Sequence, residues 1–185
     1  MISPHPKTIV LIGPESTGKS TLCETLALHY NTVWCKEYAR EYLLQNGTNY
    51  TYEDILTITK GQLALQQQAI QLANAMHPNP AVIILDTDMH VIKVWSEFVF
   101  GKCHNFVLQQ AALQQHSLYL LCDTDLPWVK DELREYASLV TRQQLFLYYK
   151  DILVQGTTPW AVVSGIGEHR TNCAVNAVEQ LRLNS

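Results

Sequence analysis

Short apolar runs alternate with longer amphipathic stretches along the whole chain. Each run suits a strand that is buried on both faces, and the runs are residues 8–12, 32–35, 81–85, 118–122 and 160–163. The stretches between them carry apolar residues at helical spacing. Strands that alternate with helices form a parallel sheet with helices on both faces. The pattern therefore predicts an α/β three-layer sandwich of about five parallel strands.

The clearest helix start in the pattern is at Thr51, which has the spacing of a capping box with Asp54. The residues that then fall near one stripe are Ile55, Ile58, Gln62, Leu65 and Ile70. The segment His77-Pro78-Asn79-Pro80 predicts a break before the third strand.

A complete phosphate-binding loop follows the first predicted strand directly. It reads Gly13-Pro14-Glu15-Ser16-Thr17-Gly18-Lys19-Ser20, and Thr21 continues into a helix. The glycines let backbone N–H groups converge on phosphate oxygens, and Lys19 adds positive charge at the β and γ phosphates. The Ser20 hydroxyl can hold Mg²⁺. These nine residues are therefore the predicted ATP-binding residues of a P-loop NTPase.

Bulk properties narrow the class of protein. The 185 residues suit a single domain over 1–185. With 13 Lys and Arg against 17 Asp and Glu there is no broad cationic field, which disfavours a nucleic-acid partner. Five cysteines without a CxxC pair, and a chain start without signal peptide or membrane span, indicate a cytoplasmic protein. We expect small-molecule substrates and a monomer or homo-oligomer.

Polar residues follow each predicted strand, at the edge of the sheet where parallel α/β proteins bind ligands. Asp86, after the third strand, is expected to support the Mg²⁺ that Ser20 holds, although an aspartate here is also a common helix cap. Asp88 either caps the next helix or faces the substrate. Both roles of Asp88 remain open from the sequence.

Glu37 and Arg40 follow the second strand, a position expected to face the phosphoryl acceptor. A carboxylate there can take the proton of an attacking hydroxyl, and a guanidinium can bind a substrate oxygen. The same i, i+3 spacing also fits a surface pair on a helix. Arg134 and Arg142 lie in or near a charged stretch that could form a lid over the phosphates at about residues 125–142, or simply a solvated helix face.

Aromatic residues adjoin the predicted acceptor side, and they are Trp34, Tyr38, Tyr42, Trp95, Phe98 and Phe100. One or two of them could stack on a flat base or a pyridinium ring, while most are expected in the core. The sequence has no HExxH and no Gly-x-Ser-x-Gly, so zinc hydrolase and serine hydrolase chemistry have no support.

Read in order, these segments resemble the ribosylnicotinamide kinase domain of bacterial NadR-type proteins, a P-loop, nucleoside-kinase-like family classed with AAA-type ATPases. The resemblance rests on the phosphate loop together with Glu37-Tyr38-Ala39-Arg40-Glu41-Tyr42, Gly61-Gln62, Asp86-Thr87-Asp88, Phe100-Gly101, and the stretch from Asp125 through Pro127-Trp128 to Arg134. It covers nearly the whole chain.

The resemblance implies transfer of the ATP γ-phosphate to the 5′-hydroxyl of nicotinamide riboside, with Mg²⁺ as cofactor. Lys19 would hold the phosphates, Ser20 and Asp86 the Mg²⁺, and Glu37 or Asp88 would deprotonate the hydroxyl. Arg134 and Arg142 would act from a lid. The acceptor would meet Glu37, Arg40 and the aromatic residues Trp34, Tyr38 and Trp95.

Two departures from the family bear on the expected activity. Some members place a tryptophan directly before the Glu-Tyr pair, where this chain has Lys36, and Trp34 lies two residues earlier on the same strand face. The first strand begins within ten residues of the chain start, so we expect no adenylyltransferase or DNA-binding domain, and a product that stops at the mononucleotide.

Two alternatives remain open from the sequence. One is a kinase for another nucleoside or small acceptor, and the other is a nucleotide-binding switch with slow hydrolysis. A guanine-specific Asn-Lys-x-Asp would favour a GTPase switch, but the fourth strand is followed by Asp123-Thr124-Asp125-Leu126.

Overall fold

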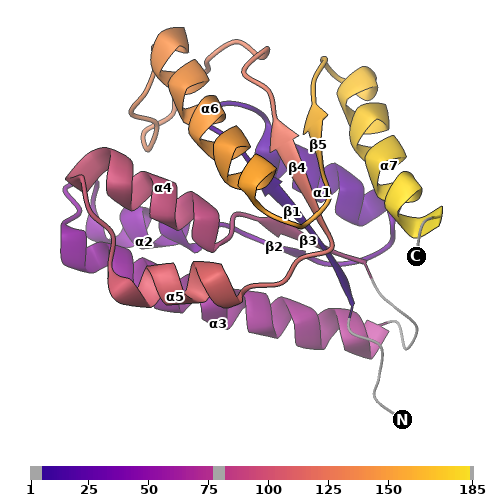
Figure 1. Ribbon diagram of the computed structural model, residues 1–185, viewed down its shortest axis with the longest axis horizontal. Helices are drawn as coiled ribbons and strands as arrows, with labels where there is room; N and C mark the ends of the chain where they lie inside the picture. The colour runs from indigo at the N-terminus through magenta and orange to yellow at the C-terminus, as the bar shows by residue number, and fades with distance from the viewer. Residues whose placement is uncertain (1–5, 77–81, 184–185) are drawn as a thin grey trace.

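Five parallel strands form one sheet at the centre of the computed structural model, which describes residues 6–76 and 82–183 (Figure 1). The strands are β1 (Lys7–Ile12), β2 (Trp34–Cys35), β3 (Val82–Asp86), β4 (Leu118–Cys122) and β5 (Trp160–Val163). Their spatial order is β2-β3-β1-β4-β5, so β1 lies in the middle between β3 and β4. The predicted parallel sheet is confirmed.

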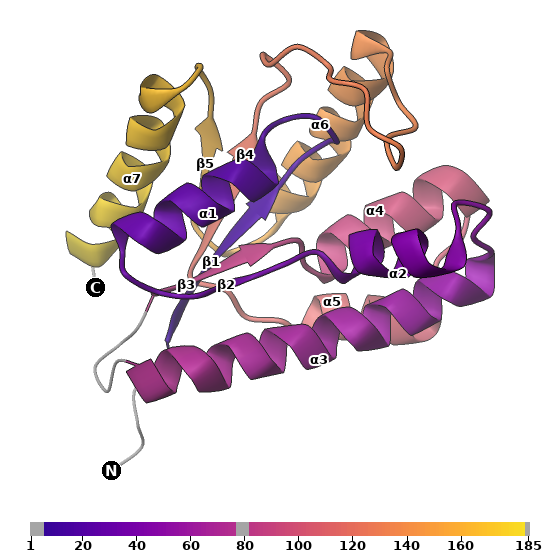
Figure 2. The ribbon, with the colours of Figure 1, turned by 180° about the vertical axis from the view of Figure 1, so that it is seen from behind.

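Helices connect the strands and cover both faces of the sheet. They are α1 (Lys19–His29), α2 (Tyr38–Asn46), α3 (Tyr52–Met76), α4 (Met89–Phe100), α5 (Asn105–Leu113), α6 (Leu139–Gln155) and α7 (Glu168–Leu183). In Figure 1 α6 lies in front of the sheet, and in Figure 2, seen from behind, α1 lies in front of it. No helix within the described ranges is long and apolar enough to cross a membrane.

Each face of the sheet has its own hydrophobic core, because successive strand residues point to opposite sides. Val10 and Ile12 of β1 pack with buried residues of α3, α4 and α6. Ile9 and Leu11 pack on the other face with buried residues of α1 and α7. A third cluster joins α3, α4 and α5 beside the sheet. The three-layer sandwich predicted from the sequence is therefore confirmed.

The second strand is shorter than the predicted run 32–35. The Thr32 backbone N–H donates to Ala27 O at the end of α1, at 2.9 Å, and the Thr32 hydroxyl donates to Val82 O at 2.5 Å. These contacts bind Thr32 to α1 and β3 outside the strand ladder, which leaves Trp34 and Cys35 to pair with β3. The predicted break at residues 77–80 and Ala81 lie outside the described residues.

The predicted capping contact holds the start of α3. The Asp54 carboxylate accepts hydrogen bonds from the Thr51 backbone N–H and hydroxyl, both at 2.7 Å. Further along this helix Gln62 is fully buried; its side-chain oxygen accepts from Tyr38 N at 2.7 Å and its amide donates to Lys36 O at 3.1 Å. Gln62 therefore fixes the turn that carries Glu37 from β2 into α2.

Gly61 lets the first residue of α2 pack closely on α3. A Cβ added at Gly61 would lie 2.1 Å from the Tyr38 ring. Gly61→Ala is therefore expected to lower the free energy of unfolding by about 1–3 kcal/mol, although alanine is the better helix former. Equilibrium urea unfolding measures the change.

A double-mutant cycle isolates the contact with the ring. In a Tyr38→Ala background the same Gly61→Ala change should raise stability by about 0.5–1 kcal/mol, because only the helix preference remains. Equal effects in both backgrounds would exclude the close ring contact as the reason for glycine at this position.

Candidate active site

The phosphate-binding loop between β1 and α1 adopts a backbone that requires its glycines. Gly13 has φ +138°, and a Cβ there would lie 2.8 Å from Cys122 O of β4. Gly18, the residue directly before α1, has φ +75°, in the left-handed region where L side chains are strained. The loop therefore presents its backbone to a cavity at the end of the sheet.

That cavity has a volume of about 800 Å³ and joins the phosphate loop to the aromatic side of the molecule. All nine predicted ATP-binding residues, 13–21, line it. Predicted site residues on other elements also line it, and they are Trp34, Glu37, Arg40, Asp86, Trp95 and Arg134. The fold thus brings most of the predicted site together in one place.

Ser20 and Asp86 lie in direct contact at the phosphate end of the cavity. The Ser20 hydroxyl donates to Asp86 Oδ2 at 2.5 Å, while Asp86 Oδ1 is buried without a hydrogen-bond partner. Burial raises the pKa of Asp86, and nearby Lys19 and the Ser20 hydrogen bond lower it. A hydroxyl beside an unsatisfied carboxylate oxygen fits Mg²⁺, which takes oxygen ligands and completes its shell with phosphates and water.

Glu37 lies at the wall of the same cavity, at the start of α2. Burial and the negative charge of Asp86 raise its pKa to about 7, although Lys19 and Arg40 act to lower it. A carboxylate with a pKa near neutrality is suited to act as a general base, because it can both accept and release a proton at physiological pH.

The β4–α6 segment, residues 123–138, crosses over the phosphate loop. The Glu15 carboxylate accepts from Trp128 Nε1 at 3.2 Å and from the backbone N–H groups of Glu135 at 3.0 Å and Tyr136 at 2.5 Å. The Ser16 hydroxyl accepts from Val129 N at 2.9 Å. Side chains of the loop thus hold the segment over the cavity, where a lid was predicted.

Within this segment Arg134 donates to Val129 O at 2.6 Å and lines the cavity. On the opposite wall, Arg40 of α2 forms an ion pair with Asp131 at 2.8 Å. This exposed pair links the segment to the helix that carries Glu37. Exposed pairs contribute little to stability, so the contact is readily exchanged for a ligand.

An aromatic wall closes the far end of the cavity. Trp95 Nε1 donates to the Tyr50 hydroxyl at 2.9 Å, and that hydroxyl donates to Glu135 at 3.1 Å. The rings of Tyr50 and Trp95 pack edge to face, with their centroids 4.8 Å apart. Trp34 lies apart from them, with the Lys36 ammonium 5.7 Å from its ring. Trp95 is therefore linked through the Tyr50 hydroxyl to the Glu135 carboxylate, while Trp34 already contacts a cation.

Asp88 takes the capping role that the sequence left open. It is fully buried, and its Oδ1 accepts from the backbone N–H groups of His90 and Val91 at the start of α4. Its Oδ2 accepts from Gln114 and from the Tyr119 hydroxyl at 2.9 and 2.7 Å. Asp88 is absent from the cavity lining. Of the two carboxylates considered as base, only Glu37 faces the cavity.

Arg142 and Tyr38 also lie elsewhere than expected. Arg142 is buried on α6 and donates to Leu126 O at 3.3 Å, so it holds the start of the β4–α6 segment without lining the cavity. Tyr38 packs its ring against Gly61 of α3. Both differences arise because a helix places successive side chains on different faces.

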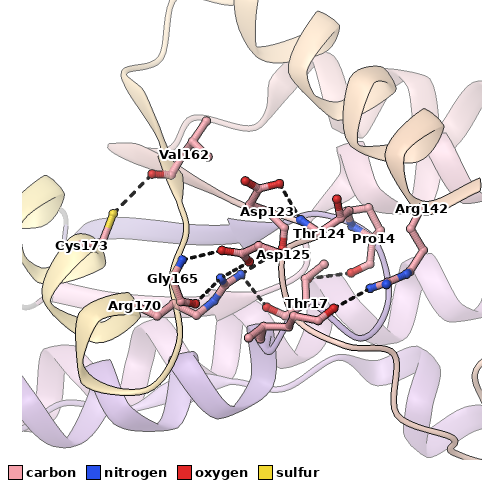
Figure 3. Close-up of polar contacts among 11 residues, drawn as sticks. Pro14, Thr17, Asp123, Thr124, Asp125, Arg142, Val162, Gly165, Arg170 and Cys173 are labelled. Atoms are coloured by element: carbon pink, nitrogen blue, oxygen red, sulfur yellow. Dashed lines mark hydrogen bonds and ion pairs between the residues drawn. The ribbon is translucent and has the colours of Figure 1, made fainter. Parts of the chain in front are cut away.

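Some residues at the site carried no usable signal in the sequence. Tyr50, Glu135 and Tyr136 line the cavity only because the segments around them fold over it. Arg170 of α7, in the polar stretch after β5, contacts the back of the phosphate loop (Figure 3). Only its position after a predicted strand indicated that Arg170 could lie near the site, and its contact with Thr17 could not be predicted from the sequence.

Comparison with known proteins places this site in a family. Residues 8–170 match the AAA domain family. Two curated relatives, from Escherichia coli (strain K12) and Salmonella typhimurium (strain LT2), are each named Trifunctional NAD biosynthesis/regulator protein NadR. Each is 31% identical over 155 residues, which make up 80% of this chain and 35% of the relative. The chain therefore spans little more than a third of these relatives' length.

Solved structures share the fold. A crystal structure of NadR protein in complex with NR has a TM-score of 0.77 at 20% identity, over 96% of this chain and 50% of that chain. Thymidylate kinase from Ehrlichia chaffeensis has a TM-score of 0.61 at 13% identity, over 98% of this chain and 100% of that chain. The same fold thus occurs in a NadR protein that binds NR and in a thymidylate kinase.

Proposed function

The chain belongs to the AAA domain family, and from this premise we propose that it transfers the γ-phosphoryl group of ATP to the 5′-hydroxyl of nicotinamide riboside. The observation that carries the proposal is one cavity that joins Lys19 and the phosphate loop to Glu37 and an aromatic wall. The relatives named for NAD biosynthesis, and the NadR structure with NR, support this acceptor.

The charge balance of the cavity favours a positively charged acceptor. Seven carboxylates line it, from Glu15, Glu24, Glu37, Glu41, Asp86, Asp131 and Glu135, against four cationic side chains, from Lys19, Lys36, Arg40 and Arg134. A pyridinium ring is attracted to aromatic faces and to carboxylates. We place the ring beside Trp95 and Glu135, because the Lys36 ammonium near Trp34 would repel a second cation.

In the proposed reaction Glu37 accepts the proton of the 5′-hydroxyl while the oxygen of that hydroxyl bonds to the γ-phosphorus. The bond from that phosphorus to the β,γ-bridging oxygen breaks, and ADP leaves. Lys19 and the loop N–H groups stabilise the negative charge on the phosphates. The β4–α6 segment, which includes Arg134, excludes water from the phosphate end of the cavity, and this limits hydrolysis of ATP.

We propose that Ser20 and Asp86 hold Mg²⁺ when ATP is bound. When present, the ion neutralises charge on the β and γ phosphates. Among the described residues no three His, Cys, Asp or Glu side chains group as a metal site. One carboxylate and one hydroxyl leave positions for phosphate oxygens and water, as Mg²⁺ sites at nucleotides require.

Acceptor assays test this function. The purified chain is incubated with Mg²⁺-ATP and a panel of nucleosides, and ADP release is measured for each. The matched pair is nicotinamide riboside and its reduced dihydro form, which has nearly the same shape without the positive charge. The proposal requires nicotinamide riboside to give the highest kcat/KM and the reduced form a clearly lower one. A neutral nucleoside as the best substrate would contradict the proposed acceptor.

A further inference from the structure

Arg170, in the first turn of α7, joins three separate loops behind the phosphate site (Figure 3). Its side chain is buried, with 4% of the residue exposed. One terminal nitrogen donates to Asp125 Oδ1 at 2.7 Å and Gly165 O at 3.0 Å, and the other to Thr17 O at 2.8 Å and Asp123 O at 3.2 Å. A single guanidinium thus links the phosphate loop to the segments after β4 and β5.

The contact with Thr17 sets the direction of the next peptide N–H. No cis peptide bond occurs in the described residues, and in a trans peptide the C=O and N–H point in opposite directions. Because the Thr17 carbonyl points at Arg170, the N–H of Gly18 points away from it. Thr17 and Gly18 both line the cavity. The Gly18 N–H is therefore available to a phosphate oxygen.

The glycine at this position makes an external constraint necessary. Gly18 has φ +75° and, without a Cβ, can also adopt other backbone conformations at little energetic cost. If the Thr17–Gly18 peptide turned over, its carbonyl oxygen would face the phosphates and repel them. The Thr17 hydroxyl, which donates to Pro14 O at 2.8 Å, holds the side chain of Thr17 but not this carbonyl.

Asp125 fixes Arg170 in place for this task. Its carboxylate pairs with Arg170 at 2.7 Å, and its other oxygen accepts from the Gly165 backbone N–H at 2.5 Å. Figure 3 shows both contacts on the side of Arg170 away from Thr17. A charged, hydrogen-bonded pair is stronger than neutral hydrogen bonds, so the guanidinium is held against the loop.

We propose that Arg170 is a positioning residue for phosphate binding, which holds the Thr17–Gly18 peptide so that the Gly18 N–H faces the phosphates of the nucleotide. The inference rests on the proposed function, since it assumes that the loop binds ATP. Arg170 itself does not line the cavity, so we expect it to act through the loop and not by direct contact with the nucleotide.

Substitutions at the pair test the proposal through nucleotide affinity. Arg170→Lys removes the planar fork that places one nitrogen on Asp125 and the other on Thr17, so the Kd for a non-hydrolysable ATP analogue with Mg²⁺ should rise about tenfold. Asp125→Asn keeps the guanidinium but weakens its anchor, and should raise the Kd about threefold. The KM for the acceptor should stay within about twofold of wild type in both variants, because neither substitution changes the aromatic wall of the cavity.

Val178→Ala is the control for stability. Val178 is fully buried on the same helix, in the core against the sheet, and does not reach the loop. Its substitution should lower the melting temperature without changing nucleotide affinity. Calorimetric titration gives the Kd, and thermal unfolding shows that each variant is folded.

The outcomes separate this inference from the function on which it rests. Failure of the wild-type chain to bind the ATP analogue would overturn the proposed function, and the inference with it. Wild-type binding with unchanged Kd in folded Arg170→Lys and Asp125→Asn would overturn the inference alone. A loss of affinity in Val178→Ala as large as in Arg170→Lys would also overturn it, since general destabilisation would then explain both.

Discussion

Replacing Lys19 with alanine is expected to lower kcat/KM for ATP by about a thousandfold. The Lys19 ammonium donates to Pro14 O at 2.8 Å and is thereby held over the loop, where the β and γ phosphates would lie. The change removes a charge that stabilises the transferring group and also binds the triphosphate. Steady-state assays of ADP formation, with ATP varied, measure the loss.

Lys150→Ala is the matched control for this change. Lys150 is exposed on α6 and lies outside the cavity lining, so its loss should leave kcat/KM within about twofold of wild type. Near-normal turnover in Lys19→Ala would remove the phosphate loop from the proposed mechanism.

Glu37→Gln is expected to lower kcat by about two to four powers of ten, with a much smaller effect on the acceptor KM. Glutamine keeps the size of the side chain but cannot take the proton of the 5′-hydroxyl. Because the raised pKa of Glu37 in the ligand-free protein is about 7, kcat/KM of the wild type should fall as the pH drops below that value and the base becomes protonated. The variant should lose this limb of the pH profile.

Two further variants give this assignment its controls. Glu53→Gln changes an exposed carboxylate on α3 and should leave both kcat and the pH profile as in wild type. Asp88→Asn alters the buried cap of α4, so it should lower stability without removing the pH limb. Loss of the limb in Asp88→Asn, with the limb retained in Glu37→Gln, would show that the base is Asp88.

The strands of the sheet could be predicted because each is specified by a short run of neighbouring residues. The runs 118–122 and 160–163 became β4 and β5 with the same bounds. β4 is buried throughout, as an apolar run predicts, whereas β5 lies at the edge of the sheet and Val162 is exposed, so it is not buried on both faces as expected. The phosphate loop was equally evident, because Gly13 and Gly18 take backbone conformations that favour glycine. Only the length of β2 was overestimated, because Thr32 forms hydrogen bonds to α1 and to Val82 O that are not part of the pairing between β2 and β3.

The walls of the site depend on contacts between distant residues and could be predicted only in part. Glu15 was recognised as part of the phosphate loop, but its hydrogen bonds to Trp128, Glu135 and Tyr136 link residues more than 100 positions apart. Nor could the sequence decide whether Asp88 caps α4 or faces the cavity. That choice follows from Tyr119 and Gln114, which the fold brings to its carboxylate.

The transfer of a labelled phosphoryl group tests the central claim most directly. The chain is incubated with nicotinamide riboside and Mg²⁺-ATP that carries ¹⁸O on the non-bridging oxygens of the γ-phosphate, and the products are separated and weighed by mass spectrometry. Phosphoryl transfer to the acceptor predicts nicotinamide mononucleotide with the label in its phosphate. Label found only in free inorganic phosphate, with the riboside unchanged, would contradict the kinase and point to a nucleotide-hydrolysing switch.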